Sequence, residues 1–311
     1  MDPPPGRLVD VGTHKLHIRC SGQGAPTVVF DAALGGSSIS WSLVQPALAQ
    51  LTRCCSYDRA GFGWSEAGPF PRTAGRITSE LSQLLRCAPV PGPYLLVGHS
   101  FGALVLRLLA SRRFDEIVGL VFIEPAIPEE WETPGEAQRE SITRGVRLCQ
   151  YGSAAARRGY ARLVARLVDF GAIGVARRLV RVLSRGGLQR ADEQILAPIW
   201  KLPPGTRALL KQMWTQPKFF EALGSQIEAI CDSASEVRRE ADADYGNLPL
   251  AVITAEGARE TRQRADALLA RRSTRGRHVL APNSGHWVPL DAPQIVIDVV
   301  ATMVREIRSR D

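Results

Sequence analysis

Apolar residues in the first 126 positions form short strand-like runs, most of them followed by a segment with helical spacing. Residues 14–19 alternate apolar and polar side chains like a half-buried strand, whereas residues 94–97 are apolar throughout. The predicted strands are 14–19, 27–30, 54–57, 94–97 and 117–123, and the predicted helices are 41–51, 73–86 and 103–109. Strands that alternate with helices in this way favour an α/β fold, with a mostly parallel sheet covered on both faces.

Strand patterns are absent from residues 127–246, which are rich in arginine and alanine. Apolar residues recur there at helical spacing, most clearly in 160–168 and 175–183. The alternating pattern then resumes, with predicted strands at 250–254 and 277–280 and predicted helices at 262–271 and 293–308. We therefore expect one α/β core, residues 1–126 and 247–311, interrupted by a helical insertion of residues 127–246.

The pentapeptide Gly98-His99-Ser100-Phe101-Gly102 lies between a predicted strand and a predicted helix. A G-x-S-x-G nucleophile elbow requires this context, because the sharp turn pushes the serine hydroxyl into the open. Glycines on either side leave room for the turn, and the following helix N-terminus offers N–H groups to an oxyanion. The motif predicts that Ser100 is a nucleophile.

A nucleophilic serine needs a base, and His286 is the best placed of the five histidines. It lies in the turn-rich loop 283–289, between the last predicted strand and the last predicted helix. In a parallel sheet, loops at the carboxyl ends of strands meet at the ligand crevice. The other histidines are His14 and His17 in the first predicted strand, His99 beside the serine, and His278 in a later strand.

The elbow, the loop Asp58-Arg59-Ala60-Gly61-Phe62-Gly63-Trp64-Ser65 and the tripeptide Ser284-Gly285-His286 together resemble the α/β-hydrolase superfamily. The resemblance covers essentially the whole chain and is strongest to esterases and lipase-like members with a helical cap. It implies the α/β-hydrolase fold, with the cap inserted after the strand ending at Ile123. It also implies hydrolysis of carboxylic esters of small to medium apolar molecules through an acyl-enzyme, with no metal or organic cofactor.

Fold alone does not fix the substrate in this superfamily. A serine at position 100 argues against the relatives that use an aspartate nucleophile. Lactonase, thioesterase, amidase, C–C hydrolase and acyltransferase activities on the same triad stay open as alternatives. So does a hydrolase-fold receptor that binds a ligand without turnover.

The first departure from the family pattern lies after the strand 27–30. Ala32-Ala33 stands where most members carry His-Gly. Because a backbone N–H needs no particular side chain, we expect Leu34 and Phe101 to form the oxyanion hole. Asp31 is unusual beside an anion site, and we expect it to pair with Arg59.

The second departure concerns the triad acid. The family's usual position, after the strand 250–254, aligns with Ala258, which Glu256 and Glu260 flank. Glu124 instead follows directly on the apolar strand 117–123, where some relatives carry their acid. A carboxylate there is costly without a partner, and His286 would supply one. We predict the triad Ser100, His286 and Glu124, with Glu256 and Glu260 as alternatives.

The apolar stripes of the insertion must be buried against something, and the crevice above Ser100 is the available surface. We expect the insertion to roof the site and to line an acyl pocket with residues such as Leu163, Leu167, Phe170, Leu179 or Trp214. Its amphipathic basic helices are also compatible with an anionic membrane surface, a reading that we favour less.

The formal net charge of +8 raises the question of nucleic-acid or membrane partners. The arginines are scattered through predicted helices, and no nucleic-acid-binding signature accompanies them, so a solvated basic face is favoured. No apolar stretch is long enough to span a bilayer, and the first residues lack a secretory pattern. The cytoplasm is therefore expected, unless a leader was removed. The sequence leaves the oligomeric state open.

Six cysteines occur without a C-x-x-C pair or histidines at metal-ligand spacing, which favours buried free thiols. The superfamily's sheet order implies that the strand of His17 runs antiparallel beside that of Tyr57. Cys20 would then lie near Cys54 and Cys55. A disulfide from Cys20 to one of these two is the alternative, and it would indicate an exported protein.

Overall fold

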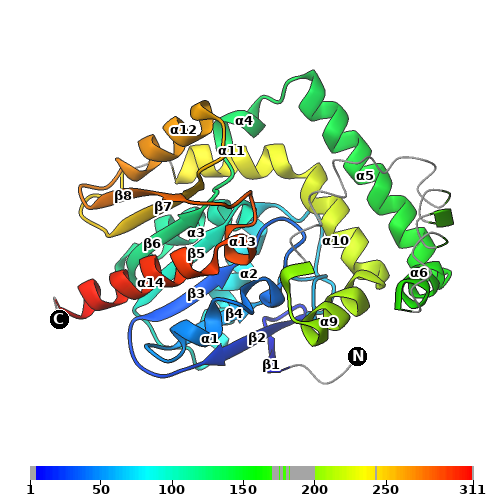
Figure 1. The fold of residues 1–311 in the computed structure, drawn as a ribbon, viewed down its shortest axis with the longest axis horizontal. Coiled ribbons are helices and arrows are strands. Elements are labelled where there is room, and N and C mark those ends of the chain that lie inside the picture. The colour runs from blue at the N-terminus through cyan, green and yellow to red at the C-terminus, as the bar shows by residue number, and fades with distance from the viewer. Residues whose placement is uncertain are drawn as a thin grey trace.

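The computed structural model describes residues 5–169, 200–241 and 244–309, together with positions 175, 178, 179 and 182. Within them lies one eight-stranded sheet, in the order β1-β2-β4-β3-β5-β6-β7-β8 (Figure 1). Its strands are β1 Arg7–Asp10, β2 Lys15–Ser21, β3 Thr27–Asp31, β4 Cys54–Tyr57, β5 Tyr94–His99, β6 Ile117–Ile123, β7 Leu250–Ala255 and β8 Gly276–Ala281. Only β2 runs antiparallel to its neighbours, so the expected mostly parallel sheet is confirmed.

Helices cover both faces of this sheet. The core helices are α1 Gln45–Leu48, α2 Ala74–Cys87, α3 Phe101–Arg112, α12 Glu260–Ala270, α13 Val288–Asp291 and α14 Pro293–Arg308, with 3-10 turns at Ser38–Trp41 and Phe114–Glu116. Side chains of α2, α3 and α12 pack on one face, and those of α1 and α14 on the other. The predicted helix 41–51 is thus shorter than expected, being a 3-10 turn followed by α1.

Neighbouring residues of the central strands divide between the two faces. In β5, Leu96 packs towards α2 and α3, whereas Leu95 and Val97 pack towards α1 and α14. All of β5 is buried. Because both faces of a parallel sheet are covered, such strands read as continuous apolar runs, which is why the sequence pattern located them correctly.

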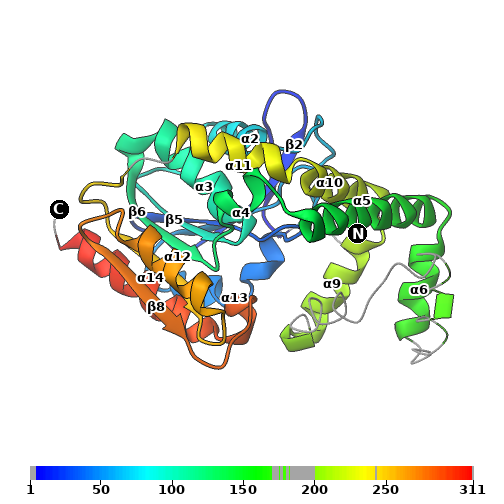
Figure 2. The same ribbon diagram turned by 90° about the horizontal axis from the view of Figure 1, so that it is seen from above.

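In the described parts of the segment between β6 and β7, helices are joined by short non-helical stretches, and no strand of the sheet occurs among these residues. Its helices are α4 Pro128–Glu132, α5 Glu136–Arg157, α6 Tyr160–Asp169, α9 Pro204–Trp214, α10 Pro217–Glu228 and α11 Ile230–Glu240. Seen from above, α5, α6, α9 and α10 extend to one side of the sheet, while α11 lies along α2 and α3 (Figure 2). The Glu236 carboxylate of α11 accepts hydrogen bonds from the Gly75 N–H (2.7 Å) and the Thr73 hydroxyl (2.9 Å), at the N-terminus of α2.

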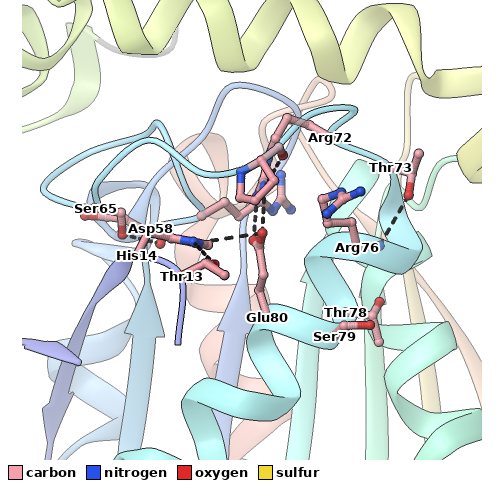
Figure 3. Close-up of polar contacts among 12 residues, drawn as sticks. Thr13, His14, Asp58, Ser65, Arg72, Thr73, Arg76, Thr78, Ser79 and Glu80 are labelled. Atoms are coloured by element: carbon pink, nitrogen blue, oxygen red, sulfur yellow. Dashed lines mark hydrogen bonds and ion pairs between the residues drawn. The ribbon is translucent and has the colours of Figure 1, made fainter. Parts of the chain in front are cut away.

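The loop between β4 and α2 is held by buried polar contacts. Asp58 lies 2.9 Å from the ring of His17, with both side chains fully buried, and accepts the Ser38 N–H at 2.7 Å. The buried Arg72 donates to both oxygens of Glu80, at 2.6 and 2.5 Å, and His14 lies 3.7 Å from the same carboxylate (Figure 3). Asp58, His14 and His17 therefore stabilise this loop.

The expectation of free thiols is wrong for one pair of cysteines. Cys20 and Cys55 are directly opposed on the antiparallel strands β2 and β4, with Cα atoms 4.1 Å apart, and they form a disulfide. Cys54, the residue before Cys55 on β4, packs on the other face of the sheet, in the apolar cluster that includes α1 and α14. Because adjacent strand residues point to opposite faces, only Cys55 can meet Cys20.

Titration of the unreduced, denatured protein is expected to find four reactive thiols, from Cys54, Cys87, Cys149 and Cys231. The same titration after reduction should find six and serves as the control. Six thiols before reduction would contradict the bridge. A count of four would also favour an oxidising compartment over the cytoplasm, since disulfides are rare where thiols are kept reduced.

In the described parts of the chain, no helix has the length and apolar character required to cross a membrane.

Candidate active site

Ser100 lies on a sharp turn between β5 and α3, with a left-handed backbone at φ 52°. Its N–H donates to the Ile123 carbonyl at 2.9 Å, and its own carbonyl accepts the N–H groups of Ala103 and Ala126, at 3.0 and 3.1 Å. A non-glycine residue rarely adopts this backbone region unless its surroundings hold it there. The three hydrogen bonds supply that support, and the geometry matches the predicted elbow.

Both elbow glycines are required by close backbone approaches. A Cβ atom on Gly98 would lie 2.9 Å from the Ala103 nitrogen, and one on Gly102 would collide with the carbonyl oxygen of Asp31. Contacts this short cannot be relieved by a side-chain rotation, because the atoms met are backbone atoms. Glycine at these positions therefore lets α3 start directly after the serine and against the end of β3.

The structure joins Glu124 to His286. Glu124 follows β6 with a left-handed backbone at φ 45°, and its Oε2 lies 3.2 Å from His286 Nδ1. Its other oxygen accepts the Ala255 N–H at 2.7 Å. The Glu124 side chain is 8% exposed, whereas the His286 side chain is 47% exposed. The buried Glu124 carboxylate thus contacts one side of the His286 ring, and the rest of that ring is accessible to solvent.

Burial by itself would raise the pKa of Glu124. The hydrogen bonds from His286 and Ala255 outweigh burial, and the positive charges of His286 and Arg262 add to them, so the pKa lies below the ordinary carboxyl value. Glu124 is therefore ionised at neutral pH. Its charge can orient the imidazole and stabilise the protonated ring.

His99 supports the backbone of His286. Burial, with the nearby charges of His286 and Arg59, lowers the pKa of His99 to about 3, so the ring is neutral at neutral pH. Its Nε2 lies 2.7 Å from the His286 carbonyl oxygen, which can only accept, so Nε2 carries the hydrogen and donates it. The two rings lie 5.0 Å apart, and the ring of Trp287 is 5.3 Å from His99.

The two backbone N–H groups expected to form the oxyanion hole, those of Phe101 and Leu34, have no hydrogen-bond acceptor in the described structure. Phe101 is the first residue of α3, so its N–H has no acceptor within the helix. Leu34 lies in a turn closed by the hydrogen bond from the Gly36 N–H to the Ala33 carbonyl, at 2.9 Å. Among the described residues, the Leu34 N–H has no acceptor. The pair is therefore available to a developing negative charge.

The expected pairing of Asp31 with Arg59 is confirmed. Arg59 donates its Nε–H to Asp31 at 2.9 Å and also binds the carbonyls of Ala32 and Ala33, which precede Leu34. Both charged side chains are almost fully buried. Burial raises the pKa of Asp31, and the adjacent Arg59 opposes that shift. Removing one partner from such a pair commonly costs about 3–5 kcal/mol of stability, so the pair holds the turn in place.

Glu256 and Glu260 are not brought to His286. The Glu260 carboxylate pairs with Arg264 at 2.5 Å on the solvent face of α12, and Gln263 donates to the Glu256 and Ala258 carbonyls. The Ser100 hydroxyl has no hydrogen bond to His286 in the described structure. Such contacts are often loose in enzymes without substrate.

The structure describes some, but not all, of the residues that we expected to line the acyl pocket. Trp214 packs against Phe219 with ring centres 6.0 Å apart, and Phe219 in turn contacts Phe62 of the core at 5.7 Å. Leu163 is 46% exposed, so its side chain is not fully covered by neighbours. Phe170 lies outside the described residues.

Sequence reasoning missed two residues at this site, His99 as a support for His286, and Arg262. Arg262 binds the carbonyl of Pro125 and contributes to the charge around Glu124. No local pattern marks either role, because each partner is distant in sequence. Among the described residues, no group of three or more His, Cys, Asp or Glu side chains is arranged to hold a metal ion.

Comparisons with known proteins agree with the observed fold. The model of the alpha/beta hydrolase family matches residues 28–299. A probable transporter, efuK, from Hormonema carpetanum is 35% identical over 127 residues, 38% of this chain and 18% of that protein. The putative carbamate hydrolase RutD of Klebsiella pneumoniae is 34% identical over 135 residues, 43% of this chain and 48% of that protein. The chain thus spans less than half the length of these curated relatives.

Among solved structures, a thermophilic esterase from Thermogutta terrifontis superposes with a TM-score of 0.66. The match covers 97% of this chain and 99% of the esterase, at 16% sequence identity. A likeness at this identity concerns the fold alone.

Proposed function

Since this chain belongs to the alpha/beta hydrolase family, we propose that it is a serine hydrolase acting on carboxylic esters of small to medium apolar molecules. One observation carries the proposal. The buried Glu124 carboxylate holds His286 Nδ1 at 3.2 Å, at the same edge of the sheet as the elbow serine. An elbow serine with a strained backbone, a carboxylate and a histidine, in this order along the chain, support nucleophilic acyl transfer.

In the proposed mechanism, the Ser100 hydroxyl attacks the ester carbonyl while His286 takes its proton. The N–H groups of Leu34 and Phe101 bind the oxyanion of the tetrahedral intermediate. His286 then gives its proton to the leaving alkoxide, and an acyl-enzyme is left on Ser100. Water, activated by His286, attacks the acyl group and regenerates the serine. Glu124 holds the imidazole in the required tautomer and stabilises its charged form.

We further propose that residues 127–246 form a cap over this site. Its helix α10 supports the idea, because Lys218 donates to the carbonyls of Gly63 and Ser65, at 3.1 and 2.5 Å. A carbon built on Gly35 would lie 3.2 Å from the Leu223 side chain, so α10 also lies close to the proposed oxyanion turn. Apolar side chains of such a cap favour uncharged acyl groups.

The proposal is tested with p-nitrophenyl esters of acetate, butyrate, hexanoate and laurate, assayed beside a thioester, a lactone and an anilide. We expect the short and medium esters to be hydrolysed fastest, because the apolar side chains of the proposed cap favour uncharged acyl groups. Faster turnover of the lactone or thioester would move the assignment to that activity on the same triad. Fluorophosphonate labelling of Ser100 without turnover of any substrate would indicate a receptor instead.

A further inference from the structure

Helix α12 touches both backbone segments that hold Glu124. One segment is Glu124-Pro125 itself, at the end of β6. The other is Thr254-Ala255 at the end of β7, whose Ala255 N–H donates to Glu124 Oε1 at 2.7 Å. The position of the Glu124 carboxylate depends on both segments, so whatever fixes the two strand ends also fixes the acid.

Two side chains of α12 make these contacts. Arg262 donates from its Nη2 to the carbonyl of Pro125, the residue after Glu124. Asp266 Oδ2 accepts the Thr254 hydroxyl at 2.7 Å, one residue before Ala255. Arg262 Nε also donates to the same oxygen of Asp266, at 3.1 Å. A continuous set of hydrogen bonds therefore runs from the end of β6, through α12, to the end of β7.

The charges of this set are buried. Asp266 has no exposed side-chain surface, and Arg262 is 19% exposed. Burial raises the pKa of Asp266 to about 6, although Arg262 and Thr254 oppose the shift. Its second oxygen, Oδ1, has no hydrogen-bond partner among the described residues. A buried carboxylate with one oxygen lacking a hydrogen-bond partner lowers the stability of the fold, so packing alone gives no reason for Asp266 at this position.

We propose that Arg262 and Asp266 are positioning residues for the triad acid, with the Arg262 guanidinium adding one positive charge to its surroundings. This inference rests on the proposed function, since it assigns Glu124 to the triad. The titratable groups around Glu124 are His286 on its open side and the Arg262–Asp266 pair behind it. His278 of β8 joins the set through the Thr254 hydroxyl, at 2.9 Å.

Helix α12 offers a matched control. Arg264 pairs with Glu260 one turn away, as Arg262 pairs with Asp266, but both Arg264 and Glu260 are more than 70% exposed. Exposed pairs of this kind contribute little to stability. Arg264→Gln removes the same chemical group from the same helix without touching either strand end.

The test compares Arg262→Gln, Arg262→Lys and Arg264→Gln by ester hydrolysis and by the rate at which a fluorophosphonate labels Ser100. Labelling needs the triad but not any particular ester, so it does not depend on the unknown substrate. For Arg262→Gln we expect kcat and the labelling rate to fall about tenfold to a hundredfold with KM nearly unchanged, because small misplacements of a catalytic group have effects of this size. Arg264→Gln should match the parent protein.

The pH dependence separates charge from position. Loss of a nearby positive charge makes protons bind more readily to the Glu124–His286 pair, so the acidic limb of the rate profile should move to higher pH in Arg262→Gln. Arg262→Lys keeps the charge but not the forked geometry. It should leave the limb near its original pH while kcat stays low.

Equal kcat and pH profiles for Arg262→Gln and Arg264→Gln would overturn the inference. A second result would also overturn it. If Arg262→Gln lowers kcat and the melting temperature but leaves the acidic limb of the pH–rate profile unshifted, the role of Arg262 is purely structural. A failure of the proposed function is recognised separately. In that case Glu124→Gln itself would leave the rate of Ser100 labelling unchanged.

Discussion

Replacement of Ser100 by alanine is expected to remove ester hydrolysis and organophosphate labelling together. The hydroxyl is the atom that attacks the carbonyl, and no neighbouring group on the elbow can replace it. Loss of a triad nucleophile commonly lowers kcat by several orders of magnitude. The fold should survive, because the elbow is held by the Ser100 backbone, which alanine retains, although φ 52° is strained for either residue.

Ser111→Ala is the matched control for this experiment. Ser111 lies near the other end of α3, where its hydroxyl donates to the Leu108 carbonyl at 2.9 Å, away from the carboxyl ends of the strands. This variant should keep both activity and labelling. Retention of more than a few per cent of the esterase activity in Ser100→Ala would refute the assignment of the nucleophile.

The second large effect is expected for Glu124→Gln, with kcat lowered about a hundredfold or more. Glutamine can still accept the Ala255 N–H, so the strand ends should stay together. It carries no charge, however, and its amide nitrogen can only donate. The imidazole then loses the partner that orients Nδ1–H and stabilises the protonated ring. Steady-state kinetics on p-nitrophenyl butyrate, with circular dichroism as a check of folding, measure the effect.

Glu256→Gln and Glu260→Gln are the controls, and both should be mild. Glu260 pairs with Arg264 in solvent, and Glu256 takes part in the described structure through backbone hydrogen bonds with Ala281 and Gln263. If Glu256→Gln were the crippling change instead, the acid would belong to the end of β7. The geometry at Glu124 would then be an ordinary buried ion pair.

Local sequence patterns were sufficient for most elements of the core. The strand at Ile117–Ile123 and the helix at Pro293–Arg308 match the predicted ranges, because a buried parallel strand and an amphipathic helix each leave a clear pattern. The strand Arg7–Asp10 was missed, since only Val9 of its four residues is buried and so short an edge strand shows no reliable alternation. The elbow was recognisable because its glycines and serine are adjacent in sequence.

Local sequence patterns thus predicted most core elements, the elbow at Ser100 and the loop that carries His286, each from residues within a few positions of one another. Only the tertiary structure decided which carboxylate meets His286, which cysteine meets Cys20, and which groups hold Glu124 from behind. Glu124 and His286 are 162 residues apart, and Arg262 reaches the Pro125 carbonyl across 137 residues. Such contacts follow from the order and register of strands in the sheet, and no local pattern of side chains encodes that order.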